Sequence, residues 1–285
     1  MKTHHANLLI TAIAPLVWGS TYIVTTTTLA NFSPMVVAML RALPAGLLLL
    51  LLTRQLPTGR WWLYTFILGA LNITLFLSLL FVATYRLPGG VAGTVLSSQP
   101  LIIIMLSAVL LSSKIRPLAI FAALIGMGGV SLLVLTADTT LDPIGIVAGL
   151  AGATSMALGM ILTQKWQVPV SALTLSAWQL TAGGLLLLPL IWLFDQPVPV
   201  PSSLNLLGLA WLSLMGAAFS YSLWFRGLQF LNANLISSLS LLSPFTAVLL
   251  GWWFLDQSLT TLQIIGIILV LVSIWFSQYA NNQHR

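Results

Sequence analysis

The sequence has no cysteine and very few ionisable side chains. Of its 285 residues, 5% are Asp, Glu, Lys or Arg, whereas a soluble domain carries about 25%. So few charges cannot cover a water-facing surface, and a lipid bilayer removes that requirement. The absence of cysteine excludes disulfides and thiolate metal sites. The three histidines, His4, His5 and His284, all lie in the tails, so we expect no metal and no cofactor.

The charge that is present is mostly basic, with a net value of +6. Because the Lys and Arg residues are scattered and form no patch, the pattern does not favour nucleic-acid binding. Basic residues of membrane proteins gather in cytoplasmic loops instead. The expected partners are therefore the lipid bilayer and a small-molecule substrate.

Long apolar runs make up most of the chain, which is 59% hydrophobic. A membrane span needs about 20 mostly apolar residues. Ten runs meet that length, and they predict spans at 8–29, 34–52, 62–83, 89–111, 117–136, 143–163, 171–194, 204–225, 233–254 and 261–279. The first run is long enough to span, so it is interpreted as a membrane helix and not as a signal peptide.

The charges orient these ten spans. An even number of crossings puts both termini on one side, and the basic residues of that side are Lys2, Arg54, Arg60, Lys114, Arg116, Lys165, Arg226 and Arg285. Only Arg86 falls on the other side, together with the four acidic residues Asp138, Asp142, Asp195 and Asp256. The positive-inside rule then predicts a multi-pass protein of the inner (plasma) membrane with cytoplasmic N- and C-termini.

The two halves of the chain resemble each other. A shift of 138 aligns 33–50 with 171–188 and places Arg41 on Gln179, and a shift of 144 aligns Pro100 with Pro244. Residues 1–137 and 138–285 then each hold five helices, and an odd number makes the second half enter from the opposite side. The predicted fold is an all-α membrane protein of ten transmembrane helices arranged as two inverted five-helix repeats.

Polar side chains within the spans are candidates for binding a substrate, because polar atoms in hydrocarbon are expected to face the bundle or a wet cavity. Aromatic rings would hold an apolar part of the substrate, and hydroxyls and amides would orient its polar end. The alternative for any single aromatic residue is packing or an interface belt. The candidates are Trp18, Tyr22, Asn72, Ser78, Thr94, Ser97, Ser98, Ser155, Trp178, Gln179, Ser220, Tyr221, Ser240 and Ser243.

Pro100 and Pro244 are candidate hinges at equivalent positions of the halves. Each proline removes a helical hydrogen bond and is expected to free the carbonyl of Leu96 or Ser240. The alternative is a simple kink whose carbonyl is satisfied by a neighbouring hydroxyl.

Arg41 is the one charge well inside a predicted span. An Arg at the centre of a span costs about 2.5–3.5 kcal/mol on insertion scales, so it requires carbonyls, water or an anion. It either captures a substrate carboxylate or ties helices together, and both interpretations remain open.

The sequence resembles the EamA family of ten-helix transporters in the drug/metabolite transporter superfamily. The resemblance covers nearly the whole chain and is carried by WGSTYIV (18–24), LRALPAG around Arg41, SSQPLIIIML around Pro100, YSLWFRGLQFLNAN (221–234) and LSPFTAVLLGWWFLDQSLT (242–260). The stretches WGSTYIVTT and LRALPAGLLLL are similar to the PecM-like subgroup of amino-acid and pigment-metabolite exporters. One departure is Asp256, where the family often has Glu.

The resemblance implies an inner-membrane secondary transporter that exports amino acids, related metabolites or drugs through a central cavity by alternating access. No Asp or Glu lies deep in a predicted span, so we expect facilitated export or exchange without a carboxylate proton relay. An integral membrane enzyme would need a positioned nucleophile, acid–base pair or metal, which the sequence does not offer. A channel-like facilitator is the third hypothesis, and we expect a monomer or a weak homodimer.

Overall fold

The computed structural model describes residues 2–87, 89–134, 142–194, 198–254 and 259–282, and these residues form helices and no strand. Nine helices in this part of the chain are long and apolar enough to cross a membrane, and Pro117–Leu133 is a shorter apolar helix. The nine long helices correspond to nine of the ten predicted spans, and the shorter helix lies where 117–136 was predicted.

The first half of the chain contains seven α-helices and one π-helical segment. They are α1 (Lys2–Thr28), α2 (Pro34–Thr53), α3 (Trp61–Gly69), η1 (Ala70–Leu75), α4 (Phe76–Arg86), α5 (Gly89–Leu96), α6 (Gln99–Leu110) and α7 (Pro117–Val134). The π-helical segment η1 interrupts a single long helix that continues from α3 to α4.

The second half contains the same kinds of element in the same order. They are α8 (Pro143–Trp166), α9 (Ala172–Leu193), α10 (Ser203–Ser213), η2 (Leu214–Phe219), α11 (Ser220–Phe230), α12 (Ala233–Leu239), α13 (Leu242–Phe254) and α14 (Thr261–Asn282). Here too a π-helical segment, η2, lies inside a long helix.

The element boundaries repeat with the offsets found in the sequence. From α2 to α9 the first residue moves from 34 to 172, a shift of 138, and from α7 to α14 it moves from 117 to 261, a shift of 144. The π-helical segments are also 144 residues apart, at 70–75 and 214–219. Ser33 and Ser171, 138 residues apart, both cap the helices that follow them, accepting hydrogen bonds from the N–H groups of Val36 and Thr174.

Equivalent helices pack on each other, α2 along α9 and α7 along α14. Glycines make both contacts close. A Cβ placed on Gly184 would lie 2.8 Å from the main chain of Leu43, and one on Gly129 would lie 2.9 Å from the amide nitrogen of Val270. Small residues at these positions let helix backbones approach, which is how helices associate where lipid removes the hydrophobic driving force.

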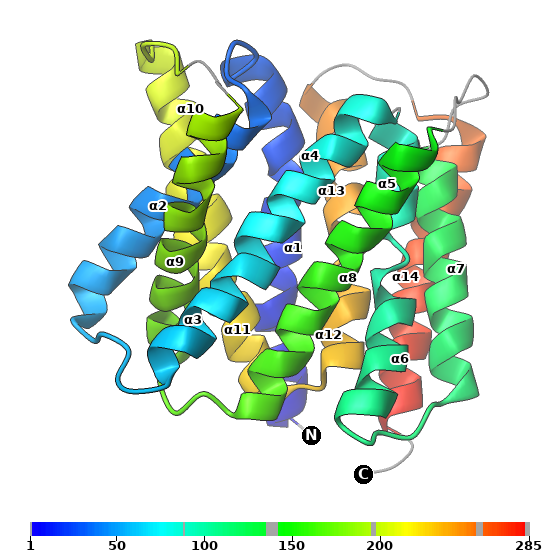
Figure 1. Cartoon of the computed structure of the whole chain (residues 1–285). Helices are drawn as coiled ribbons and strands as arrows, with labels where there is room; N and C mark the ends of the chain where they lie inside the picture. Colours follow the sequence, from blue (N-terminus) through cyan, green and yellow to red (C-terminus); the bar gives the residue numbers. More distant parts are fainter. Residues whose placement is uncertain (1, 88, 135–141, 195–197, 255–258, 283–285) are drawn as a thin grey trace.

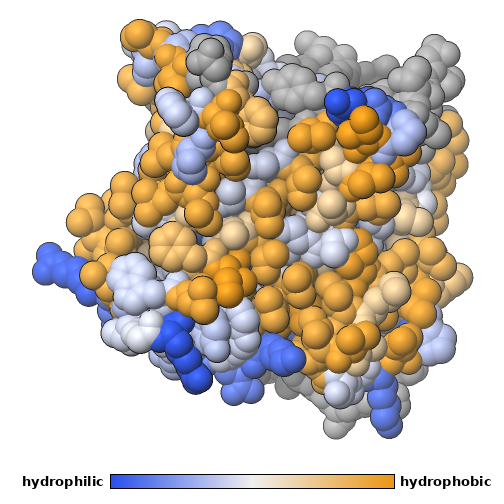
Figure 2. Space-filling model, viewed as in Figure 1, coloured by the Kyte–Doolittle hydropathy of each residue, from blue (hydrophilic) through white to orange (hydrophobic). Residues whose placement is uncertain are grey.

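The surface and the chain ends fit a protein in a bilayer. In Figure 1, α1 begins and α14 ends at the same end of the bundle, where the loops after α2, α6, α8 and α11 also lie. Figure 2 shows hydrophobic residues over the middle of this face and hydrophilic residues toward its lower and upper edges. Many large apolar side chains are exposed, such as Val109 at 78% and Trp192 at 83%, and lipid can cover them.

The two candidate hinge prolines begin helices and do not interrupt them. Pro100 lies in the first turn of α6, after α5 has ended at Leu96, and Pro244 lies near the start of α13. A proline in a first turn removes no helical hydrogen bond. The Ser240 carbonyl, which was expected to be free, accepts a hydrogen bond from the N–H of Ser243 at 3.0 Å.

Two neighbouring glycines of α7 provide a matched test of the close helix packing. Gly129 faces the α14 backbone, whereas a Cβ on Gly128 would meet nothing within 4 Å. We expect Gly129→Ala to destabilise the protein by roughly 1–3 kcal/mol through overpacking. Gly128→Ala should be neutral or stabilise by up to about 1 kcal/mol, because alanine favours a helix. Thermal unfolding of both variants in detergent measures this, and equal shifts in the midpoint would contradict the packing described.

Candidate substrate site

A main-chain carbonyl in η2 joins three segments of the bundle. The Gly216 oxygen accepts a hydrogen bond from the indole Nε1 of Trp18 in α1 at 2.9 Å and from Nη2 of Arg41 in α2 at 2.8 Å. A π-helical segment disturbs the regular carbonyl pairing of a helix, and such segments are frequent at functional sites. The Ser220 hydroxyl donates a hydrogen bond to the Met215 carbonyl five residues earlier, so a side chain next to η2 also satisfies one of the carbonyls of η2.

The Arg41 guanidinium lies against a glycine and lacks a described acidic partner. A Cβ built on Gly216 would be 3.6 Å from Nε and Nη2 of Arg41, so the cation rests close to the backbone. Its second contact, from Nη1 to Thr21 Oγ1, is long at 3.5 Å. The ion pair present among the described residues is Arg86–Asp142. These contacts support the interhelical-tie interpretation of Arg41, and they leave the guanidinium without a counter-charge from the described residues.

An aromatic cluster adjoins this carbonyl. The Trp18 ring lies 5.2 Å from Tyr221 and 5.0 Å from Trp224, between ring centroids, and Tyr221 lies 5.7 Å from Phe225. These separations are typical of favourable aromatic pairs. Tyr221, Trp224 and Phe225 are almost fully buried, whereas Trp18 is half-buried. Trp18 is therefore the ring of this cluster that can still contact another molecule.

The other π-helical segment forms a neutral counterpart of this site. Asn72 in η1 donates its side-chain amide to Oε1 of Gln179 in α9 at 2.7 Å, and Ser155 in α8 donates to the Leu71 carbonyl at 2.9 Å. Oδ1 of Asn72 and Nε2 of Gln179 are buried without a protein partner. Leaving such atoms unpaired costs free energy, so this amide pair is only partly satisfied.

The two sites occupy equivalent positions. Gln179 follows Arg41 by 138 residues and Gly216 follows Asn72 by 144, so the contact of Arg41 with Gly216 corresponds to that of Gln179 with Asn72. The sequence pairing of Arg41 with Gln179 already predicted half of this correspondence. Gly216 itself was missed, and its alignment with Asn72 under the 144-residue shift was the signal available.

Several predicted site residues make local contacts. Ser97, Ser98 and Ser240 each donate to a carbonyl three residues earlier in the chain, and Thr94 supplies one of those carbonyls. Such bonds satisfy hydroxyls inside a bundle without involving another molecule.

The remaining predicted residues have varied surroundings. Trp178 donates to the Gln55 carbonyl at 2.7 Å, and Tyr22 is 56% exposed. The Ser78 hydroxyl is buried and unpartnered, and the Ser243 carbonyl lies close to Gly19 of α1. The structure thus brings together Trp18, Arg41, Ser220 and Tyr221 around η2, and Asn72, Ser155 and Gln179 around η1.

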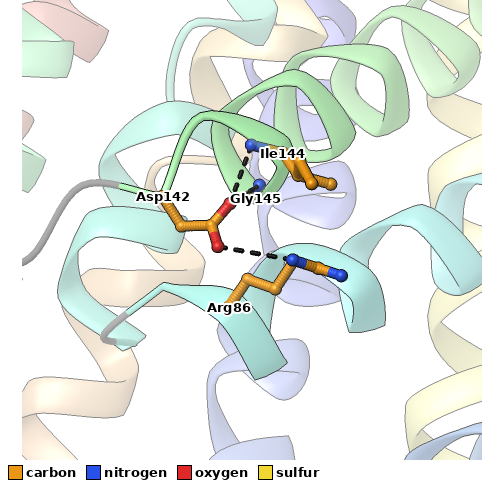
Figure 3. A network of polar contacts seen from close by, with 4 residues as sticks. All are labelled: Arg86, Asp142, Ile144 and Gly145. Carbon is orange, nitrogen blue, oxygen red and sulfur yellow. Dashed lines mark hydrogen bonds and ion pairs between the residues drawn. The ribbon is translucent and has the colours of Figure 1, made fainter.

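An ion pair lies at the end of the bundle opposite the termini. Figure 3 shows Asp142, which precedes α8, accepting from the N–H groups of Ile144 and Gly145 and facing Arg86 at the end of α4. The Gly145 N–H is the main cause of a lowered pKa of the Asp142 carboxyl; the Ile144 N–H and Arg86 add to the lowering, against partial desolvation.

The fold and these sites define a multi-pass helical membrane protein whose polar groups converge on two equivalent helix interruptions. The chain belongs to the EamA-like transporter family, which matches residues 6–135 and 143–279. It is thus a membrane transporter of the drug/metabolite transporter superfamily.

Two relatives and one solved structure are similar to this chain over most of its length. Protein PecM of Dickeya dadantii is 43% identical over 260 residues, which cover 90% of this chain and 87% of PecM. The uncharacterized inner membrane transporter YedA of Escherichia coli K12 is 27% identical over 253 residues, covering 87% of this chain and 82% of YedA. A solved structure titled "Crystal structure of protein" is 22% identical, covers 99% of both chains and has a TM-score of 0.84, which shows the shared fold.

The Asp142 cap makes stability depend on pH in a defined direction. A lowered native pKa means that the ionised carboxylate stabilises the fold above its unfolded pKa of about 3.9, and that this contribution disappears as pH falls through the native pKa. Asp142→Asn keeps a capping side chain but removes the charge, whereas Asp142→Ala removes both. At neutral pH we expect the unfolding midpoint to fall in both variants, and more in Asp142→Ala.

The deficit of Asp142→Asn should shrink as the pH is lowered toward about 3. A deficit that stays constant over this range would show that the carboxylate charge contributes nothing to stability.

Proposed function

We propose that the chain exports amino acids or related small metabolites or drugs across the inner membrane by alternating access. The arrangement that we propose is ten spans in two inverted five-helix repeats, residues 1–137 and 138–285. The observation that carries this proposal is the recurrence of one pair of offsets, 138 and 144, in helix boundaries, helix caps, π-helical segments and side-chain contacts. Two equivalent halves that can exchange conformations are a frequent basis of alternating access.

The proposed orientation has cytoplasmic termini. The start of α1 and the end of α14 share one end of the bundle with the loops that carry Arg54, Arg60, Lys114 and Arg116. Cytoplasmic loops of membrane proteins are enriched in Lys and Arg, which supports this orientation. YedA is named as an inner membrane transporter, which supports the same location for this chain.

The proposed substrate cavity lies between the halves. Trp18 and Arg41 are its principal residues, and the buried Tyr221 packs against the Trp18 ring. As secondary contacts we retain the hydroxyls of Ser97, Ser98 and Ser240, which make local bonds, together with those of Ser78, Thr94 and Ser243. Pro100 and Pro244 remain proposed hinges, now as the first turns of α6 and α13, where two-residue breaks separate these helices from α5 and α12. Such breaks give each helix a place to pivot without losing hydrogen bonds from its interior.

We propose facilitated export or exchange as the mode of transport. Arg86–Asp142 lies at one end of the bundle, outside the long apolar helices, so the described acid is badly placed for a proton relay through the membrane. Asp138, Asp195 and Asp256 lie outside the described residues. The family and the relative YedA are named as transporters, which favours transport over catalysis.

A resistance screen tests function and direction together. A strain that overproduces the protein is exposed to amino acids, their analogues and dyes. We expect raised resistance to at least one of these compound classes and a lower cellular content of that compound. Trp18→Ala should abolish the resistance, because it removes the accessible ring and the Gly216 hydrogen bond.

Trp192→Ala is the matched control, since Trp192 is 83% exposed and should not affect transport. Increased sensitivity and a higher cellular content would instead indicate import. Resistance that persists in Trp18→Ala at equal expression would exclude this site.

A further inference from the structure

Arg41 places a positive charge deep inside an apolar helix. It lies seven residues after Pro34, the first residue of α2, which is roughly 10 Å along the helix axis. The described contacts use one strong acceptor, the Gly216 carbonyl at 2.8 Å, and one distant hydroxyl at 3.5 Å. A guanidinium has five N–H donors, so most of its donor capacity is available to another acceptor.

The other half of the chain shows what a purely structural tie requires. At the position equivalent to Arg41, Gln179 joins α9 to η1 through a neutral amide bond to Asn72 of 2.7 Å. The same connection between equivalent helices is therefore made without a charge. Because an intramembrane Arg is expensive, the charge at Arg41 calls for a role that Gln179 does not have.

The surroundings of Arg41 and of Gln179 also differ in how far their side chains are exposed. Gln179 is completely buried and Asn72 is 1% exposed, whereas Arg41 and Trp18 are half-buried. Because part of the Arg41 side chain is exposed, we infer a route from the guanidinium to a solute, and the Trp18 ring offers apolar surface beside it.

We propose that Arg41 binds the carboxylate of the transported substrate, and that Trp18 packs against an apolar part of the same molecule. This inference rests on the proposed function, because it places the anion site in the proposed cavity. The planar guanidinium matches a carboxylate with two parallel hydrogen bonds. The bond to the Gly216 carbonyl holds the cation in position for this contact. The substrate class is thereby narrowed to small acids and zwitterions that carry an apolar group.

Single-cysteine chemistry tests the charge of this site directly, because the native chain has no cysteine. Thr21→Cys puts a thiol next to Nη1 of Arg41. The purified variant in detergent is reacted with two methanethiosulfonates of similar size, one bearing a sulfonate and the other a trimethylammonium group. The ratio of the two rates cancels any change in the thiolate fraction, so it reports the attraction of an anion. We expect this ratio to fall by about tenfold when Arg41→Gln is added.

Two further variants separate charge from packing. The double change Arg41→Gln with Gly216→Asn is designed to re-create the Gln179–Asn72 pair, and the atoms nearest a Cβ on Gly216, at 3.6 Å, belong to the Arg41 side chain that is shortened. It should fold with an unchanged unfolding midpoint and show the same loss of anion preference. Thr58→Cys, in the exposed loop before α3, should keep its ratio when Arg41 is changed.

Protection of the Thr21→Cys thiol by added compounds then tests whether the site binds a carboxylate. Phenylacetate should slow the reaction of the Thr21→Cys thiol when Arg41 is present, whereas the neutral isostere phenylacetamide should not. An unchanged rate ratio, a thiol that reacts with neither reagent, or equal protection by both compounds would overturn the inference. If export depends on Trp18 while the ratio does not change, the proposed function stands and the anion site fails. If the ratio falls and no compound is exported, the anion site stands and the proposed function fails.

Discussion

A main-chain carbonyl inside the hydrocarbon needs a donor, and in this protein the Gly216 carbonyl receives two. Water is absent from a bilayer core, so each backbone polar group must be satisfied within the protein. A continuous α-helix does this by itself, but the π-helical segments η1 and η2 do not keep the regular pairing. Trp18 and Arg41 satisfy the carbonyl in η2, and in doing so they connect α1 and α2 to this segment. The aromatic cluster, the half-buried cation and the proposed cavity all depend on this one acceptor.

Close helix packing supplies the scaffold that holds this arrangement. The pairs α2–α9 and α7–α14 meet through glycines, so their backbones lie near each other and fix the relation between the halves. The two segments differ in exposure, and the proposed mechanism uses this difference. The neutral Asn72–Gln179 pair is buried, whereas Arg41, which contacts Gly216, is partly exposed.

Sequence patterns predicted much of this fold, because apolar length and repeat spacing are local properties of the chain. The nine long helices coincide with predicted spans, and the 138-residue shift pairs Arg41 with Gln179 from the sequence alone. The π-helical segments were not predictable, since ALNITL and LMGAAF resemble any apolar helix. The contact of Trp178 with the Gln55 carbonyl and the outward position of Tyr22 depend on tertiary packing, which a helix-face pattern does not contain. Gly216 was missed because its own side chain carries no polar group, and only its alignment with Asn72 under the 144-residue shift pointed to it.

The central claim is that two equivalent halves expose one binding site alternately. Counterflow in proteoliposomes tests it most directly, with a compound identified by the resistance screen loaded inside and its labelled form added outside. The account predicts transient, saturable accumulation of label that persists across a range of pH values without an imposed proton gradient. Flux that does not saturate and shows no counterflow would indicate a channel, and strict dependence on a proton gradient would contradict facilitated exchange.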